Sequence, residues 1–370
     1  MNLKEHRTLG RSGLVVSPLA LGTMTFGTAR WGTDNAASKT VFNAYLEAGG
    51  NFIDTADVYA GGRSEEMLGT FVAERRLRQQ LVLATKAGFS AGSGASNGGN
   101  GAKHVYTALE GSLKRLRTEY VDLFWMHIWD SVTPAEELLD TMNSLVRAGS
   151  IRYWGMSNAP AWYVAKLATL ATARGLQGPI AMQYFYSLVN RDIEDEHIPL
   201  AREIGSGIVP WSPLAYGLLT GKYDRAKVEA AGPRASGLPN EAAKNNEKRS
   251  EDDKRLDGAN PFGDSLFTER NWRVVDELKR VAADIGQSPA RVALAWVCGR
   301  PGVTSTLIGA SRAEQVTDNF AALDVQLAPE HRASLDAVSV SSEPRMLYSL
   351  FAPAVRQNTV FGGTSVAGWP

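Results

Sequence analysis

Residues 51–86 read NFIDTADVYAGGRSEEMLGTFVAERRLRQQLVLATK and contain the repeating unit of the chain. NFIDT (51–55) and LVLATK (81–86) are short apolar runs of the length typical of buried strands. Between them Ser64, a residue that can cap a helix, precedes apolar residues spaced for one helical face. That face comprises Met67, Leu68, Phe71 and Val72. The stretch therefore predicts a strand, a helix and a second, parallel strand.

The same alternation recurs along most of the chain. The predicted strands are residues 18–22, 51–55, 81–86, 121–127, 151–157, 180–186, 207–213 and 304–310. Further helices are predicted over residues 35–48, 105–117, 134–149 and 161–174. Thr133-Pro134-Ala135-Glu136 indicates a capping box with proline at the first helical position. The strands are continuous apolar runs, as in parallel sheets covered on both faces. Open and closed sheets both fit, but eight units over about 300 residues favour a (β/α)8 TIM barrel.

Three segments depart from this alternation. Two short apolar segments around Gly10–Gly13 indicate an N-terminal β-hairpin. Residues 222–265 are polar and charged, so we expect a long surface loop after the seventh strand. Residues 338–370 form a C-terminal tail, which is either a disordered end, a flap over the barrel mouth or an inter-subunit contact. We expect a single domain, residues 1–370, that carries these additions.

Composition excludes several classes of function. Lys plus Arg and Asp plus Glu both total 39, so no basic excess indicates a nucleic-acid partner. The single cysteine, Cys298, lies in an apolar helical stretch and is expected to be a buried, inert thiol. The first 13 residues contain no apolar signal segment, and no run of 18 apolar residues occurs. We therefore expect a soluble, cytoplasmic protein that does not enter membranes.

The glycine-rich segment AGFSAGSGASNGGNGA (87–102) follows a strand and precedes a helix. It nearly matches the dinucleotide-binding pattern G-x-G-x-x-G, but Asn97 occupies the third position and many more glycines follow. Flexible low-complexity sequence explains the segment better than a Rossmann turn does. A nucleotide, if one binds, must therefore be held in another way.

Polar side chains occupy the ends of three consecutive predicted strands. The second strand ends in Asp54, the third in Lys86 and the fourth in His127, and Tyr59 lies in the loop after the second. Active sites of (β/α)8 barrels form where the strands end. Each residue alone has an ordinary structural explanation, but their convergence at one end of neighbouring strands predicts an active site.

These residue types suit proton transfer to a carbonyl oxygen. A buried Lys86 needs a counter-ion, which Asp54 can supply. We expect Lys86 to lower the pKa of Tyr59 toward the working pH, so that Tyr59 can donate a proton to a developing alkoxide. His127 can orient the same carbonyl oxygen. A hydride must come from a cofactor, because no side chain delivers one. Asp57 is expected to be a loop residue with local hydrogen bonds.

At this point the sequence resembles the aldo-keto reductase superfamily over roughly residues 5–325. The motifs that carry the resemblance include NFIDTADVY, VLATK, LKRLRTEYVDLFWMH, GSIRYWGMSN, WSPLAYGLLTGKY and STLIGASRAEQVTDN. They are closer to bacterial members and to voltage-gated potassium channel β-subunits than to the aldose reductase branch. The resemblance implies a (β/α)8 barrel that binds NAD(P)H in an extended form without a Rossmann domain.

The resemblance also implies roles for individual residues. The catalytic tetrad falls on Asp54, Tyr59, Lys86 and His127. The implied cofactor-binding residues are Gly22, Thr23, Met24, Asp54, Ser157, Asn158, Gln183, Trp211, Ser212, Pro213, Leu214, Gly217, Lys222, Gly309, Ser311, Arg312, Gln315 and Asn319. Of these, Ser157, Asn158 and Gln183 would hold the nicotinamide carboxamide, and Trp211 would stack on the ring.

The cofactor is expected to be NADPH rather than NADH. Ser311 and Arg312 precede the last barrel helix, and a helix N-terminus with an arginine suits a 2′-phosphate. Gln315 departs from the family pattern, since many members have arginine there. Four aromatic residues near the mouth, Phe26, Trp31, Phe89 and Trp129, are candidates for a bulky or ring-shaped substrate. A sugar, an alicyclic ketone and a xenobiotic carbonyl all fit.

The sequence thus predicts an NADPH-dependent reductase of a small-molecule carbonyl, with Tyr59 as general acid. The alternative is a nucleotide-sensing binding subunit, similar to a channel β-subunit, with residual reductase activity. A metal-dependent barrel hydrolase fits poorly, because the chain has five histidines and shows no ligand cluster, so no metal site is expected. The sequence is compatible with a homo-oligomer and does not choose an oligomeric state.

Overall fold

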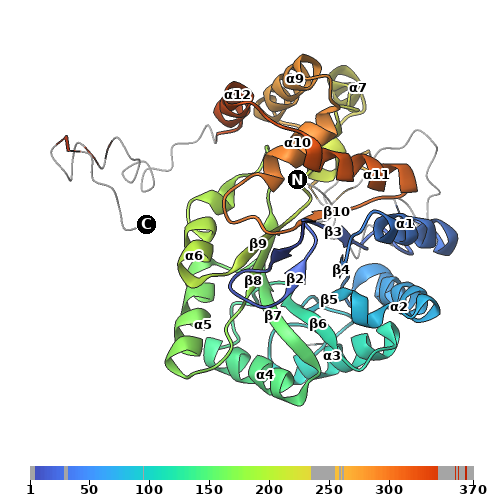
Figure 1. Ribbon diagram of the computed structural model, residues 1–370, viewed down its shortest axis with the longest axis vertical. Coiled ribbons are helices and arrows are strands. Elements are labelled where there is room, and N and C mark those ends of the chain that lie inside the picture. The colour runs from blue at the N-terminus through green and yellow to red at the C-terminus, as the bar shows by residue number, and fades with distance from the viewer. Residues whose placement is uncertain are drawn as a thin grey trace.

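The computed structural model describes residues 5–28, 32–94, 96–234, 255–257, 260, 262–340, 355, 357, 363 and 364. Within these residues, eight parallel strands form one sheet in the order β10-β3-β4-β5-β6-β7-β8-β9. Helices connect the strands and surround the sheet (Figure 1). The predicted (β/α)8 barrel is confirmed.

The eight strands lie inside the eight predicted apolar runs. Their bounds are β3 (Leu19–Gly22), β4 (Phe52–Asp54), β5 (Val82–Ala87), β6 (Val121–Met126), β7 (Ile151–Ser157), β8 (Ala181–Phe185), β9 (Gly207–Trp211) and β10 (Thr306–Ile308). The helices of the first two-thirds of the chain are α1 (Asn35–Glu47), α2 (Arg63–Arg75), α3 (Ala102–Leu116), α4 (Ala135–Ala148), α5 (Ala161–Ala173) and α6 (His197–Ile204).

The remaining helices follow β9. They are α7 (Arg225–Ala230), α9 (Glu269–Asp284), α10 (Pro289–Cys298), α11 (Ala313–Ala321) and α12 (Pro329–Ser339). Figure 1 shows α7, α9 and α12 beyond α10, outside the ring of helices around the barrel. Every helix in the described part of the chain is too short or too polar to cross a lipid bilayer.

The two ends of the sheet meet and close the barrel. The last strand pairs in parallel with the first, with Thr306 opposite Leu19, so β10 lies beside β3 (Figure 1). On the other side of β10, Ile208 of β9 forms a parallel bridge with Val303. The N–H of Ile208 donates to Gly302 O at 2.9 Å, and the N–H of Thr304 donates to Ile208 O at 2.9 Å. The closed form, one of two that the sequence allowed, is therefore the observed one.

The predicted N-terminal hairpin closes one end of the barrel. Strands β1 (Arg7–Thr8) and β2 (Val15–Val16) pair antiparallel. The turn needs glycine at Gly10, where φ is +60° and a Cβ would lie 2.5 Å from Gly205 O. Apolar residues of the hairpin pack against inward-facing residues of the strands. This inner cluster comprises Leu9, Leu14, Val16, Ala20, Phe52, Val82, Ala84, Leu123, Trp125, Ala181, Val209 and Leu307.

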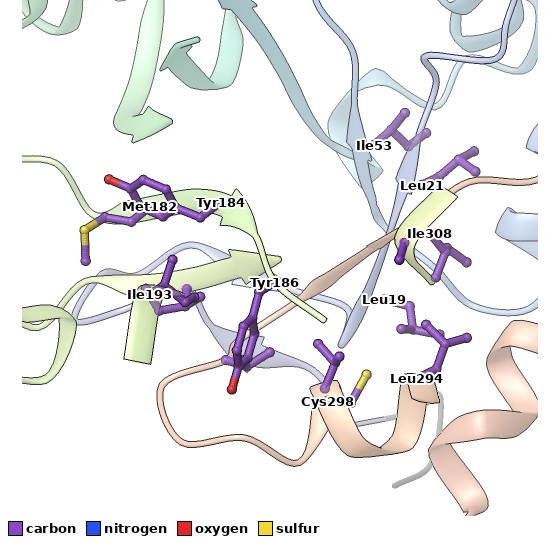
Figure 2. Close-up of a cluster of buried hydrophobic side chains, with 14 of the residues drawn as sticks. Leu19, Leu21, Ile53, Met182, Tyr184, Tyr186, Ile193, Leu294, Cys298 and Ile308 are labelled. Atoms are coloured by element: carbon purple, nitrogen blue, oxygen red, sulfur yellow. The ribbon is translucent and has the colours of Figure 1, made fainter. Parts of the chain in front are cut away.

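A second and larger core lies between the strands and the helices. Figure 2 shows Leu19 of β3 beside Leu294 of α10, and Leu21 of β3 near Ile308 of β10 and Ile53 of β4. Cys298 of the same helix is 4% exposed, and its thiol donates to Thr306 Oγ1 at 3.4 Å. The expected buried thiol is confirmed.

Two helix starts differ from the prediction. Helix α2 begins at Arg63 after Gly62, and the buried Ser64 hydroxyl donates to Thr23 O at 2.9 Å instead of capping the helix. Helix α4 begins at Ala135 after Pro134, which is the N-cap rather than the first helical residue. The predicted capping box is wrong because Asp130 binds Thr133, which donates from its hydroxyl to Asp130 Oδ2 at 2.6 Å.

The segment 222–265 is only partly the surface loop that was expected. Its first part forms α7, and Leu256 is fully buried, with its N–H donating to Tyr223 Oη at 2.8 Å. Of the predicted tail 338–370, residues 338 and 339 end α12, and most of the rest lies outside the described residues.

Tyr45 of α1 provides a test of how the helix layer holds β4. Its fully buried hydroxyl lies 2.9 Å from Leu19 O and 2.7 Å from Phe52 O, and accepts from Phe52 N at 3.0 Å. We expect Tyr45→Phe to lower the free energy of unfolding by about 1–3 kcal/mol, because buried backbone groups lose their partner. Urea denaturation measures this value.

The matched control is Tyr106→Phe, since Tyr106 is 41% exposed. Its unfolding free energy should equal that of the wild type. Equal stability of the Tyr45 variant and the wild type would contradict the assigned role of the hydroxyl.

Candidate active site

The barrel interior brings the predicted polar residues together above the inner cluster. Asp54, Lys86 and His127 each lie two residues beyond a member of that cluster, on or just after β4, β5 and β6. Side chains alternate along a strand, so these three face the same interior, one layer nearer the strand ends. Trp125 fills the space below them across Gly155, where a Cβ would lie 2.5 Å from the indole ring.

An ion pair occupies the centre of this layer. The Lys86 side chain is 0% exposed and pairs with the Asp54 carboxylate, which is 2% exposed. The ammonium also donates to Thr55 O at 2.8 Å and lies 3.4 Å from Tyr59 Oη. The other Asp54 oxygen accepts from Gln183 Nε2 at 3.2 Å. The predicted partnership between the lysine and the aspartate is present in the structure.

Burial and charge act in opposite directions on this pair. Burial favours the neutral forms, so it raises the pKa of the Asp54 carboxyl, and the Lys86 ammonium offsets part of that rise. Burial would also lower the pKa of Lys86, but the Asp54 carboxylate and Tyr59 hold that pKa above its usual value. Lys86 is therefore an ammonium at neutral pH, with Asp54 as its counter-ion.

Tyr59 lies at the start of a 3₁₀ turn, Tyr59–Gly62, just past β4. Burial raises its pKa above the usual value, and the neighbouring Lys86 lowers it by less. The expected net decrease in the pKa of Tyr59 is therefore wrong, because desolvation of the phenolate outweighs the lysine charge. The hydroxyl remains protonated at neutral pH and keeps a proton that it can donate.

His127 follows β6 and faces the same space. Its ring lies 5.8 Å from the Tyr59 ring and 4.5 Å from the ring of the half-buried Phe89. Burial and the Lys86 charge hold the pKa of His127 well below its usual value, so the imidazole is neutral. Within the described residues, its Nδ1 has no hydrogen-bond partner. A neutral ring can donate one hydrogen bond to a ligand in this space.

The three residues predicted to bind a carboxamide form one network with Trp211. The Ser157 hydroxyl donates to Gln183 O at 2.9 Å, and Asn158 Nδ2 donates to His127 O at 2.9 Å. The indole of Trp211 donates to Asn158 Oδ1 at 3.3 Å. Asn158 has a φ of +48°, an uncommon conformation that often marks a functional site.

The loop after β9 has an unusual backbone. Ser212, Ala215 and Tyr216 have φ values of +50°, +47° and +56°, and Gly217 follows at +94°. Left-handed residues of this kind turn backbone N–H groups into concave sites that bind anions. The N–H of Gly217 donates to Leu214 O at 2.9 Å within the turn. The same segment contains the predicted residues Pro213 and, exposed beyond the turn, Lys222.

The predicted residues at the end of β3 border the ion pair. Gly22 is opposite Asp54 in the sheet, and the N–H of Thr23 donates to Asp54 O at 2.9 Å. Thr23 is buried, whereas Gly22 and Met24 keep part of their surface exposed. These residues therefore form the edge of the same cavity layer.

The last of the predicted cofactor-binding residues lie between β10 and α11 or on that helix. Gly309 is exposed, and Arg312 is the exposed N-cap of α11, so the predicted position at a helix N-terminus is confirmed. Gln315 accepts from the N–H of Ser311 at 2.8 Å and from its hydroxyl at 3.2 Å. Asn319 is 6% exposed, one turn further along the helix.

The four aromatic residues predicted for substrate differ in their positions. Phe26 is fully buried in the core against Phe71, so this residue has no exposed surface for a substrate. Trp31 lies outside the described residues. Trp129 is half-buried beside Trp162, with ring centroids 5.6 Å apart. Phe89 and Trp129 thus remain as candidates.

Several residues of the mouth were missed by sequence reasoning. Phe185 ends β8 and stacks on Trp211 at 4.9 Å, and Phe262 packs against Tyr216 at 4.7 Å. Arg255 lies over the Tyr216 ring, 4.4 Å from its centroid. Apolar residues within the charged segment 222–265 were the available signal that this segment folds back on the barrel.

Asp57 lies in the loop after β4, as expected, but its carboxylate does not make the local hydrogen bonds that were expected. It is 6% exposed, and neither carboxyl oxygen makes a hydrogen bond of good geometry within the described residues. Burial and the neighbouring Glu65 carboxylate raise the pKa of Asp57 to about 7, and Arg115 opposes them. Arg115 already pairs with Glu65 at 2.6 Å. Asp57 is therefore a buried acid behind the site, with its N–H donating to Lys86 O at 3.1 Å.

Comparison with known proteins extends the resemblance. The model of the Aldo/keto reductase family matches residues 18–340. A probable voltage-gated potassium channel subunit beta of Oryza sativa subsp. japonica is 37% identical over 92% of this chain and 98% of that protein. An uncharacterized oxidoreductase of Bacillus subtilis (strain 168), YrpG, is 34% identical over 88% of this chain and 93% of that protein. The NADP(+) aryl-alcohol dehydrogenase of Phanerodontia chrysosporium is 32% identical over 90% of this chain and 86% of that protein.

Asp57 gives a prediction for stability against pH. Its folded pKa of about 7 exceeds the unfolded value of 3.8, so the folded state binds more protons between these values. Stability therefore falls as pH rises from about 4 to 7, by up to about 4 kcal/mol for three pKa units. Asp57→Asn should remove this loss, so that the variant gains stability relative to wild type over that window. Urea unfolding at about pH 4.5 and about pH 8, close to the two ends of this window, measures the stability difference between the variant and the wild type.

Asp276→Asn is the control for this substitution, because Asp276 is exposed on α9. A stability difference between Asp57→Asn and wild type that stays constant with pH would show that Asp57 is ionised in the folded protein throughout.

Proposed function

The chain is an oxidoreductase of the aldo/keto reductase family, and we propose that it reduces an aldehyde or ketone to an alcohol with NADPH. The observation that carries this proposal is the buried Lys86 ammonium, which contacts both the Asp54 carboxylate and the Tyr59 hydroxyl. Members of the family typically use nicotinamide cofactors, which supply the hydride that no side chain can provide.

In the proposed reaction, Tyr59 is the general acid. Its Oη–H would donate a proton to the carbonyl oxygen, and a bound nicotinamide cofactor would supply the hydride for the carbonyl carbon. Burial keeps the phenol protonated before the step, and the ammonium of Lys86 stabilises the phenolate that the step creates. Asp54 holds the ammonium in place and keeps it charged. The two opposing effects on the pKa of Tyr59 thus serve different stages of one reaction.

We assign the orientation of the carbonyl to His127. Its neutral imidazole adds no charge beside Lys86 and can donate to the same carbonyl oxygen as Tyr59. Donors that already point at the position of a developing charge lower the barrier without reorganisation.

The polar network beside the ion pair fits a nicotinamide carboxamide. The side chains of Ser157, Asn158 and Gln183 supply both donors and acceptors at the centre of the barrel, next to Asp54. The left-handed turn at Ser212–Gly217 suits a pyrophosphate, because concave turns of this kind present backbone N–H groups to an anion; those of Ala215 and Gly217 already bond within the turn. Arg312 at the start of α11 suits the 2′-phosphate that distinguishes NADPH from NADH.

We propose bulky, ring-containing carbonyl compounds as substrates. The half-buried Phe89 packs against His127, and Trp129 lies in the loop that follows His127. One relative is named an aryl-alcohol dehydrogenase, which supports testing aromatic aldehydes first.

A nucleotide-sensing binding subunit is the second candidate, because one relative at 37% identity is named a probable potassium channel subunit. Copurification of a membrane-protein partner, together with NADPH binding and no turnover in a panel of carbonyl compounds, would favour it over the reductase.

Tyr59→Phe tests the proton donor. We expect kcat for an aromatic aldehyde to fall by about 10²–10⁴, because the variant loses general acid catalysis. NADPH affinity, measured by fluorescence titration, should stay close to that of the wild type. Tyr106→Phe controls for the loss of a tyrosine hydroxyl elsewhere. Undiminished reduction by the Tyr59 variant would refute the assignment.

The ratio of Michaelis constants tests the cofactor. We expect a KM for NADPH about tenfold below that for NADH, since Arg312 pairs with the 2′-phosphate. Arg312→Ala should raise the KM for NADPH and leave that for NADH unchanged, so NADH is the internal control. Equal values in the wild type, or a preference for NADH, would contradict the proposal.

A further inference from the structure

The segment after β9 returns to the mouth of the barrel at Arg255 and Leu256. Leu256 is fully buried; its N–H donates to Tyr223 Oη at 2.8 Å, and its carbonyl accepts from Asn260 Nδ2 at 3.3 Å. Asn260 is itself 2% exposed and also donates to Gly263 O at 3.1 Å. These bonds fix the backbone next to Arg255, so its side chain starts from a defined position.

The guanidinium of Arg255 lies over a tyrosine ring of the turn that follows β9. Its Cζ is 4.4 Å from the centroid of the Tyr216 ring. The hydroxyl groups of Tyr216, Tyr223 and Tyr59 are all close enough to act on its charge. Arg255 therefore places a positive charge at the same mouth as Tyr59, although it lies 196 residues further along the chain (255 − 59).

The Tyr216 ring under this charge begins a wall of aromatic contacts. Phe262 contacts Tyr216 edge-on at 4.7 Å and Phe185 at 5.7 Å, and Phe185 stacks on Trp211 at 4.9 Å. Such walls have a low dielectric constant and strengthen the field of a cation near them. A planar ligand could pack on these rings while an anionic group on it meets the guanidinium.

We propose that Arg255 determines substrate specificity by binding an anionic group, such as a carboxylate, on a ring-containing carbonyl substrate. The carbonyl of that substrate faces Tyr59, and its anionic group faces the Tyr216 side of the mouth. This inference rests on the proposed reductase function. A cofactor phosphate is the other anion that could reach this position, and the test must distinguish the two sources.

The test compares 4-carboxybenzaldehyde with 4-methylbenzaldehyde in the full-length wild type and in Arg255→Met. We expect the wild type to prefer the carboxylated aldehyde. The variant should lose about 10–100-fold in kcat/KM for that aldehyde alone, because it loses a hydrogen bond between charged groups. Arg255→Lys should recover part of the preference because it restores the charge. Arg273→Met is the control, since Arg273 is exposed on α9.

Equal losses for both aldehydes would overturn the proposal. So would an increase in the KM for NADPH without a change in aldehyde preference, which would assign Arg255 to a cofactor phosphate.

A binding measurement separates this inference from the reductase function. Tryptophan fluorescence, which Trp211 makes sensitive to the mouth, is titrated with 4-(hydroxymethyl)benzoate and with benzyl alcohol. Tighter binding of the carboxylate than of benzyl alcohol by the wild type, and loss of that difference in Arg255→Met, would support the role of Arg255. This result would hold even if no aldehyde were reduced, and the absence of reduction would refute the reductase function alone. Equal affinities in wild type and variant would overturn the role of Arg255.

Discussion

The buried ion pair between Lys86 and Asp54 is the interaction on which the rest of the site depends. Removing two such charges from water costs several kcal/mol per ion, and only close contact with further hydrogen bonds offsets that cost. The barrel supplies both: β4 and β5 are neighbours in the sheet, while Thr55 O and Gln183 Nε2 bond the pair. A closed sheet of parallel strands makes this geometry possible inside the apolar interior of the protein.

The pair links the elements of the site into one unit. Gln183 connects Asp54 to Ser157, and Asn158 connects His127 to Trp211 and also donates to Ser157, so the ends of five strands share a continuous set of contacts. Burial raises the pKa of Tyr59 and Lys86 offsets only part of that rise, so the phenol stays protonated with the ammonium 3.4 Å from its oxygen. The same network thus holds the proposed proton donor, the counter-ion of Lys86 and the groups proposed to bind a carboxamide.

The barrel and its central residues could be predicted because they depend on local pattern. Apolar runs mark the strands, and residues at strand ends such as Asp54 and Lys86 must converge in a barrel. Other features depend on packing that no short stretch specifies. Asp57 is buried by α2 and α3, Phe26 turns into the core, and Arg255 reaches the mouth only because Leu256 is anchored to Tyr223. The pKa of Tyr59 was mispredicted for the same reason, since its burial is a tertiary property.

A double-mutant cycle on Asp54 and Lys86 tests the central claim most directly. The kcat/KM for an aromatic aldehyde is measured in wild type, Asp54→Asn, Lys86→Met and the double variant. If the two residues act as one unit on Tyr59, each single variant loses about a hundredfold or more and the double variant loses little beyond that. Losses that multiply in the double variant would show that the two act independently, and would contradict the account.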